Sequence, residues 1–213
     1  MTGVQTCALP IFYVSTRSSS LACRLAFILA GLPGEVKELG LRAGEHQTPE
    51  YLAITAKGQV PALLLDSGET ITETPAIMLA IGEMAPHSGL IPRDQIGRWR
   101  VIEWLSWCAY HFPRAFQPAF VPAVFGPPPA ENQIRQAGIK RVEDAMAFIE
   151  SELGSRDFIV GNHLTAADLY IAMLTTFTGF LGVAPPDALM AHRARIFALP
   201  ILADTLRSEG FAA

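Results

Sequence analysis

The spacing of hydrophobic residues changes character near residue 86. Before that point, short apolar runs between turn residues are typical of strands, and repeats at three and four residues are typical of helices. The predicted strands cover residues 11–15, 35–41, 60–65 and 70–72. The predicted helices cover residues 21–32, a short segment opened by Thr48–Pro49, and residues 74–84. This order, β-α-β-α-β-β-α, predicts a small α/β unit over residues 11–86.

Residues 87–93 have the composition of a linker, and only helices are predicted after them. A long helix passes Trp99 and is expected to fade at Pro113, because proline lacks a backbone donor. The later helices are predicted at residues 139–153, 164–180 and 198–208. The first of these is amphipathic, whereas the second is apolar nearly all round and therefore predicts a buried central helix. The fold class is α/β followed by an all-α domain over residues 94–213.

Thr165 to Asp168 match a helix capping box at the start of the central helix. Such a box uses the carboxylate of Asp168 to bind backbone donors, so we interpret Asp168 as structural rather than catalytic. Met1 to Pro10 fit none of these patterns and lack the basic start of a signal peptide. We expect residues 1–10 to be a non-native or disordered start, and we give Cys7 no role.

Composition then narrows the class of protein. Half of the 213 residues are hydrophobic and 17% are charged, which excludes a disordered chain. The richest apolar stretch, residues 21–32, is too short to span a membrane. A net charge of −4 argues against nucleic-acid binding. The three cysteines form no zinc or disulfide pattern, so we expect no metal and a cytoplasmic location.

Four segments carry a resemblance to a known family, and they stand in its order along the chain. They are Phe12-Tyr13-Val14-Ser15 with the serines and Arg24 that follow, Lys57-Gly58-Gln59-Val60-Pro61-Ala62-Leu63, Glu73-Thr74-Pro75-Ala76-Ile77, and the capping box behind Phe158-Ile159-Val160-Gly161. The chain resembles the soluble glutathione transferases, and the bacterial beta and zeta types in particular. The resemblance implies a thioredoxin-like N-terminal domain, a helical second domain, a homodimer and glutathione as co-substrate.

The resemblance also implies where glutathione binds. If Pro61 is cis, as in the family, the backbone of Val60 pairs with the cysteinyl unit of the tripeptide. Thr74 opens a helix, whose N-terminus attracts the γ-glutamyl carboxylate, and Glu73 attracts the ligand's ammonium group. Lys57 is implied to contact the glycine carboxylate, although a solvated loop lysine fits the sequence nearly as well. The predicted glutathione-binding residues are Ser18, Lys57, Gln59, Val60, Pro61, Glu73 and Thr74.

The group that activates the thiol is expected in the serine run before Leu21. A hydroxyl donor beside a helix N-terminus favours a thiolate. Ser19 satisfies two alignments with the family, one by counting back from Arg24 and one by counting forward from Tyr13. We therefore predict Ser19 as the donor and Ser20 as the next candidate, while helix capping alone remains an alternative for both. The cysteine of the beta type is absent, which argues against its reductase chemistry.

The second substrate is expected to be a small hydrophobic electrophile. Residues 112–130 hold several aromatic side chains among prolines, and these side chains either wall an apolar pocket or form a packed helix break or dimer contact. The predicted pocket residues are Trp107, Tyr110, His111, Arg114 and Phe116. His111 lies near the position of the beta-type histidine, but that position itself is Pro113.

Three functions remain open from the sequence. The first is a glutathione transferase that adds the thiolate to an electrophile. The second is a zeta-like cis–trans isomerase of an acidic substrate of the maleylacetoacetate type, for which Arg17 and Arg114 are the candidate cations. The third is a non-catalytic binding module with the same fold, which the retained glutathione-site residues disfavour.

Overall fold

The computed structural model describes residues 9–211. Its sheet has the strand order β2-β1-β3-β4. Strand β1 pairs in parallel with β2 and antiparallel with β3, which pairs antiparallel with β4. The strands are β1 (Ile11–Val14), β2 (Glu35–Glu38), β3 (Ala62–Leu64) and β4 (Thr70–Thr72). All four predicted strands are present, two of them several residues shorter than predicted.

The alternation of side chains along β1 divides the apolar residues into two clusters. Phe12 and Val14 face the main core with helices α1 (Ser20–Leu29) and α3 (Thr74–Met84). Tyr13 faces the other side, where it packs edge-on against Tyr51 of the short helix α2 (Pro49–Leu52). Thr48 caps α2, because its side chain accepts from the backbone N–H of Tyr51, as the Thr48–Pro49 pair predicts.

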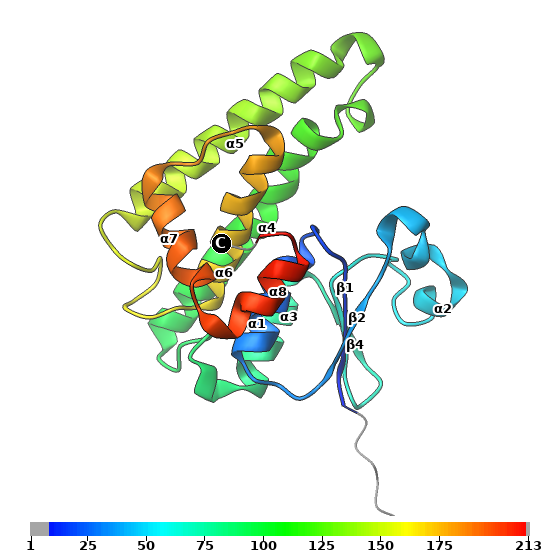
Figure 1. Ribbon diagram of the computed structural model, residues 1–213, viewed down its shortest axis with the longest axis vertical. Coiled ribbons are helices and arrows are strands. Elements are labelled where there is room, and N and C mark those ends of the chain that lie inside the picture. The colour runs from blue at the N-terminus through cyan, green and yellow to red at the C-terminus, as the bar shows by residue number, and fades with distance from the viewer. Residues whose placement is uncertain (1–8, 212–213) are drawn as a thin grey trace, which may run out of the picture.

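The rest of the chain is helical. The helices are α4 (Gln95–Phe120), α5 (Glu131–Leu153), α6 (Ala166–Thr178), α7 (Asp187–Phe197) and α8 (Ala203–Ser208). Single-turn 3₁₀ segments lie at Leu41–Ala43, Glu45–Gln47, Pro86–Ser88, Pro122–Val124, Pro128–Ala130, Gly179–Leu181 and Pro200–Leu202. Every residue of α6 is buried, and α6 packs against α1, α4 and α7 (Figure 1). This confirms the predicted central helix and the thioredoxin-like plus all-helical fold class.

Helix α4 continues through both of its prolines, so the predicted end at Pro113 is wrong. A proline at position i leaves the carbonyl at i−4 without its helical donor. For Pro118 that carbonyl belongs to Arg114, and Nη1 of Arg141 on α5 donates to it at 3.4 Å. Packing against α5 therefore compensates part of what the prolines cost, and a neighbouring helix supplies a donor that local sequence does not reveal.

Helices α4 and α5 approach closely at Gly138. A methyl group there would meet the backbone nitrogen of Ala119 at 2.6 Å, so only glycine fits. The buried face of α5 runs through Gly138, Val142, Met146 and Ile149. The predicted stripe began instead at Ile139, which is only half-buried because the glycine next to it makes the contact.

The capping box at the start of α6 is present, and Asp168 is fully buried. One oxygen, Oδ2, accepts from the backbone and hydroxyl of Thr165 at 2.8 Å each. The other, Oδ1, accepts from the backbone of Ile159 at 2.8 Å and lies 3.0 Å from Nε2 of His192. Asp168 thus joins a loop, α6 and α7.

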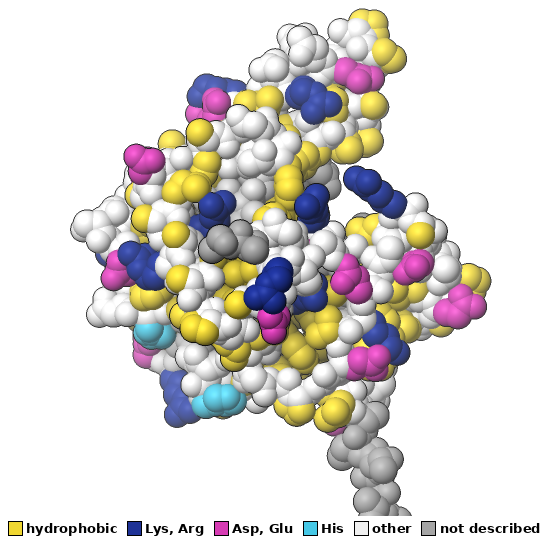
Figure 2. Space-filling model, in the orientation of Figure 1, with side chains coloured by type: hydrophobic (Ala, Val, Ile, Leu, Met, Phe, Trp, Pro, Cys, Tyr) yellow, Lys and Arg dark blue, Asp and Glu magenta, His cyan; other side chains and the backbone are white. Residues whose placement is uncertain are grey.

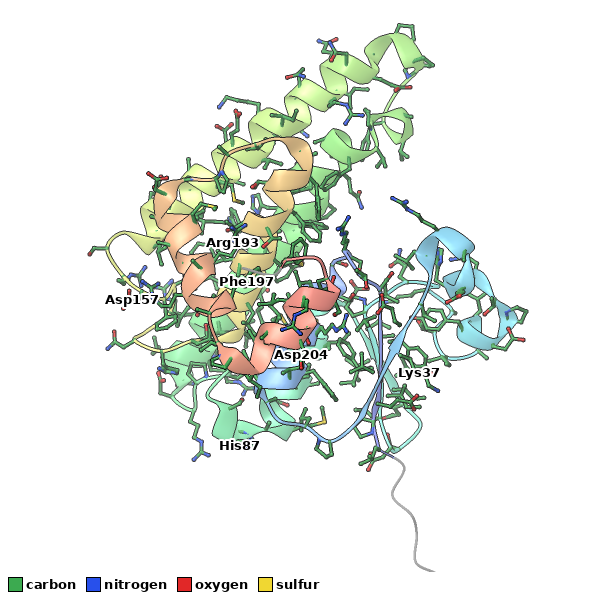
Figure 3. The ribbon with its side chains drawn as sticks, in the orientation of Figure 1. Lys37, His87, Asp157, Arg193, Phe197 and Asp204 are labelled. Atoms are coloured by element: carbon green, nitrogen blue, oxygen red, sulfur yellow. The ribbon has the colours of Figure 1, made fainter. Side chains whose placement is uncertain are left out.

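Helix α7, which the hydrophobic pattern did not predict, packs on α6 through Leu189, His192 and Ile196. Its outer side carries Arg193, whose guanidinium lies 5.8 Å from the ring centroid of Phe197 (Figure 3). Most of the predicted non-native start, including Cys7, lies outside the described residues. Over residues 9–211, no helix is both long and apolar enough to cross a membrane. The same residues contain no cluster of three or more metal-binding side chains.

Candidate functional site

A cleft of about 510 Å³ lies between the α/β part and the helical part of the molecule. Figure 2 shows the surface hollowed between the upper helices and the lobe that holds α2, with basic side chains at the rim. The α/β part contributes Ser18, Ser19, Leu41, His46, Gln47, Lys57, Gly58, Gln59, Val60, Pro61, Thr72, Glu73, Thr74 and Pro75. The helical part contributes Ala109, Phe112, Pro113, Gln117 and Tyr170.

Three serines form the turn before α1, and they differ in what their hydroxyls do. Ser20 is fully buried, donates to the carbonyl of Ser15 at 2.9 Å and accepts from its backbone N–H at 3.0 Å. Ser18 donates to the same carbonyl at 2.7 Å. Ser19 stands at the N-cap of α1 but makes no capping hydrogen bond, and it lines the cleft. Of the three, the predicted donor Ser19 has the free hydroxyl, whereas Ser20 supports the turn from inside.

Two carboxylates hold the backbone of this turn. Oε1 of Glu38 accepts from the backbone N–H of Thr16 at 3.2 Å, and Oε2 of Glu209 accepts from that of Arg17 at 2.7 Å. Nη1 of Arg24 lies 3.0 Å from Glu209 and 3.9 Å from Glu38, so one guanidinium joins both. Glu209 is fully buried. Sequence reasoning missed it, because a contact across so many residues leaves no local signal.

The Val60–Pro61 peptide is cis, as the family resemblance predicts. The strand pairing of β3 begins at Ala62, so the backbone of Val60 lies outside the sheet and lines the cleft. The segment is held from behind by Tyr51, whose hydroxyl donates to the carbonyl of Gln59 at 2.7 Å. Burial, and next the neighbouring Tyr13, raise the pKa of Tyr51 to about 12, so this donor stays protonated.

Thr74 opens α3 at the edge of the cleft, and Glu73 before it has a φ of 72°. Nζ of Lys57 lies 2.6 Å from Oε1 of Glu73 and 2.8 Å from the hydroxyl of Thr72. The side chains of Lys57 and Glu73 are 51% and 64% exposed. A pair this exposed is worth about 1 kcal/mol or less, so an anionic ligand can replace it.

The five predicted substrate-pocket residues do not line this cleft. Trp107, Tyr110, His111 and Arg114 lie around a separate cavity of about 540 Å³ on α4 and α5, and Phe116 is buried in the core. The cleft residues Ala109, Phe112 and Pro113 precede or follow them by about two positions, and two positions turn an α-helix by about 200°. The predicted residues Trp107, Tyr110, His111 and Arg114 therefore lie on the face of α4 that is turned away from the cleft.

The wall that α4 and α6 present to the cleft is apolar or uncharged, whereas the basic side chains come from the α/β part. Lys57 and His46 are the lysine and histidine among the lining residues, and no arginine lines the cleft within residues 9–211. Nδ1 of His46 is buried without a hydrogen-bond partner in the same part of the chain. Sequence reasoning missed His46 and Tyr170. A lone histidine in a loop and a tyrosine in a buried helix are not distinctive in sequence.

Comparison with known proteins matches both parts of the chain. The N-terminal domain family of glutathione S-transferases matches residues 17–84, and their C-terminal domain family matches residues 111–200. A glutathione S-transferase, GstA, of Escherichia coli O157:H7 is 30% identical over 164 residues, which are 76% of this chain and 79% of the relative. A maleylacetoacetate isomerase of Pseudomonas aeruginosa is 31% identical over 164 residues, 75% of this chain and 76% of the relative.

A solved structure extends the match to nearly the whole fold. A sphingomonad glutathione S-transferase, solved in complex with glutathione, is 31% identical in sequence. The two structures superpose with a TM-score of 0.82 over 95% of this chain and all of the other. Sequence identity, coverage of both domains and the shared fold agree, and this chain belongs to the glutathione S-transferase family.

Proposed function

We propose that the protein is a glutathione transferase that adds the thiolate of glutathione to a small hydrophobic electrophile. The observation that carries the proposal is the free hydroxyl of Ser19, which stands at the start of α1 in a cleft that also holds the outward backbone of Val60. The sphingomonad relative was solved in complex with glutathione, and its structure covers 95% of this chain.

The cleft has a partner for each group of an extended tripeptide. The backbone of Val60, supported by Gln59 and Pro61, pairs with the cysteinyl unit in the manner of strand addition. Thr74 at the N-terminus of α3 receives the γ-glutamyl carboxylate, and Glu73 faces the ammonium group. Lys57 then leaves its ion pair with Glu73 and binds the glycine carboxylate instead. His46 also lines the cleft.

When glutathione binds in this way, its sulfur lies at the turn formed by Ser18 and Ser19. A free thiol has a pKa of about 8.5 and is mostly protonated at neutral pH. A donated hydrogen bond and the positive end of α1 stabilise the thiolate. Phe112, Pro113 and Ala109 then offer the electrophile an apolar surface.

The proposed reaction is tested with purified protein, glutathione and a panel of electrophiles. We expect conjugation of an aromatic halide, seen as thioether formation, at a rate that saturates with glutathione. In the same experiment an unsaturated cis-diacid is offered with catalytic amounts of glutathione. Isomerisation without conjugation would replace the transferase by the isomerase. Glutathione binding without either reaction would indicate a binding module.

The isomerase is the second candidate, because the relative from Pseudomonas aeruginosa bears that name. The cleft favours the transferase. A diacid substrate needs cations near the sulfur, and neither Arg17 nor Arg114 lines the cleft. Arg114 instead lies over the ring of Tyr110 on the outer face of α4, 4.7 Å from its centroid.

We also propose that two copies of the chain associate through the outer face of α4 and α5. Ile96, Trp99 and Tyr110 are 62%, 55% and 56% exposed, and Phe148 is 43% exposed. Trp99 and Tyr110 stand eleven residues apart, about three helical turns, and so share a face. Exposed apolar surface of this kind is typical of an interface.

Substitution in this face is expected to separate the copies. Phe148→Glu places a charge against Trp107, whose ring stacks on Phe148 at 5.2 Å, and should convert a dimer to the 23.0 kDa chain. Sedimentation equilibrium measures the mass. Val124→Glu is the matched control, because Val124 is 76% exposed in the 3₁₀ segment Pro122–Val124 that follows α4, and this change should leave the mass unchanged. A wild-type protein that sediments as a single chain would contradict the proposal.

Two further proposals follow the family. Residues 11–86 form the glutathione-binding domain, 87–93 the linker and 94–213 the domain that lines the electrophile site. The protein works in the cytoplasm, which agrees with the free, fully buried state of Cys23 and Cys108.

A further inference from the structure

Tyr170 is the residue of α6 that reaches the cleft, whereas the other residues of this helix lie within the core. Only 3% of the residue is exposed. Its position is unusual for a polar group, because a hydroxyl carried by a central core helix normally bonds to the protein around it. The neighbouring threonines of α6 do so. Thr175 and Thr176 both donate to carbonyls one turn back.

The Tyr170 hydroxyl lies where α1, α3 and α4 converge. Thr74 of α3 is beside it, and the thiols of Cys108 on α4 and Cys23 on α1 are close enough to act on its ionisation. Burial, and next Cys108, raise the pKa of Tyr170, so the phenol remains a neutral donor at any physiological pH. Cys23 donates to the backbone carbonyl of Thr74 at 3.6 Å. Thr74 itself lines the cleft.

The side chains of Tyr170 and Thr74 interact with each other, which lowers the pKa of Tyr170 against the larger effect of burial. Among residues 9–211, the side-chain atoms that are sealed from solvent without a partner are both histidine nitrogens, in His46 and His192. Neither hydroxyl is thus sealed without a partner, and both residues line the cleft. A nearly buried, neutral donor therefore lies beside the residue that opens α3.

We propose that Tyr170 is a glutathione-binding residue of the helical domain, whose hydroxyl donates to the γ-glutamyl α-carboxylate together with Thr74. The inference rests on the proposed function and adds a third donor to that subsite. A carboxylate has acceptor positions for several donors, so the backbone and hydroxyl of Thr74 and the phenol can bind it at once. The sulfur is the weaker alternative, since its expected place is at Ser19 and Tyr170 lies beside Thr74.

The experiment is a titration calorimetry comparison of two ligands on two variants. Tyr170→Phe removes one charge-assisted hydrogen bond and should weaken glutathione binding about tenfold. It should leave the affinity for glutathione amidated at the γ-glutamyl α-carboxylate unchanged. Tyr13→Phe is the control. Tyr13 is 6% exposed and packs on the opposite side of the sheet, so its hydroxyl should not affect either ligand.

Each result bears on the inference. Equal affinity of wild type and Tyr170→Phe for glutathione overturns the inference. An equal loss of affinity for glutathione and for its amidated form also overturns it, because such a loss would indicate a packing role. A third result would assign the hydroxyl to the sulfur instead. In that case glutathione bound to Tyr170→Phe would show a lower ultraviolet thiolate absorbance than in wild type, while both proteins would still bind glutathione more tightly than its amidated form. Wild-type protein that binds no glutathione would refute the proposed function itself.

Discussion

Replacing Ser19 by alanine should lower kcat for conjugation by about a hundredfold. This is the typical cost of removing one hydrogen-bond donor to an anion in an active site, here the glutathione thiolate. The Ser19 hydroxyl makes no capping bond, so its removal leaves the turn intact. The affinity for glutathione should hardly change, because the peptide backbone and carboxylates keep their partners. Activity should also move to higher pH, since the thiol then ionises nearer its ordinary pKa of about 8.5. Steady-state rates across pH measure both effects.

Ser20→Ala is the companion variant, with the opposite expectation. Its hydroxyl makes two hydrogen bonds to Ser15 in a fully buried position, so its loss should lower the melting temperature. The protein that remains folded should conjugate at close to the wild-type rate. If Ser20→Ala loses activity while Ser19→Ala keeps it, the assignment of the donor is reversed.

Removal of the Glu209 carboxylate should cost about 3–5 kcal/mol of folding free energy, because it leaves Arg24 without its main partner in a largely buried place. Glu209→Ala also leaves the backbone N–H of Arg17 unpaired. The turn that carries Ser19 then loses one of its two carboxylate supports. We expect a lower denaturant midpoint together with weaker turnover in the fraction that stays folded.

Asp204→Ala is the matched control for Glu209. Asp204 also bonds to an arginine, Arg207 on the same helix, but its side chain is 93% exposed (Figure 3). An exposed ion pair contributes little, so the denaturant midpoint should stay within experimental error. Similar effects from both variants would mean that the end of the chain acts through general packing and not through the turn.

Much of the fold follows from local patterns. Period-two runs and turn residues mark β4 and the start of α3 at the residues where they occur, and the Thr48–Pro49 and Thr165–Asp168 caps predict the starts of α2 and α6. The failures come from tertiary contacts. Helix α4 passes Pro113 and Pro118 with help from a side chain of α5, and α7 is too weakly amphipathic to be recognised before α6 gives it a partner.

The candidate site divides in the same way. Val60 and Thr74 belong to contiguous motifs, and both line the cleft, as the sequence predicts. Glu209, His46 and Tyr170 enter from distant segments, and only the folded chain brings them to the turn and cleft. The sequence does not give the helical phase of α4, and a shift of two positions along this helix exchanges the face toward the cleft for the outer face, where Trp107, Tyr110, His111 and Arg114 lie.

The contact between α1 and α6 has a consequence for how such genes recombine. Helix α1 belongs to the first part of the chain, yet Leu21, Leu25 and their buried neighbours share one continuous core with α6. A chimera joined in the linker would pair an α1 from one parent with an α6 from another. A functional chimera therefore requires parents whose α1 and α6 helices have complementary packing surfaces. Alternatively, α1, α6 and Glu209 must all come from the same parent.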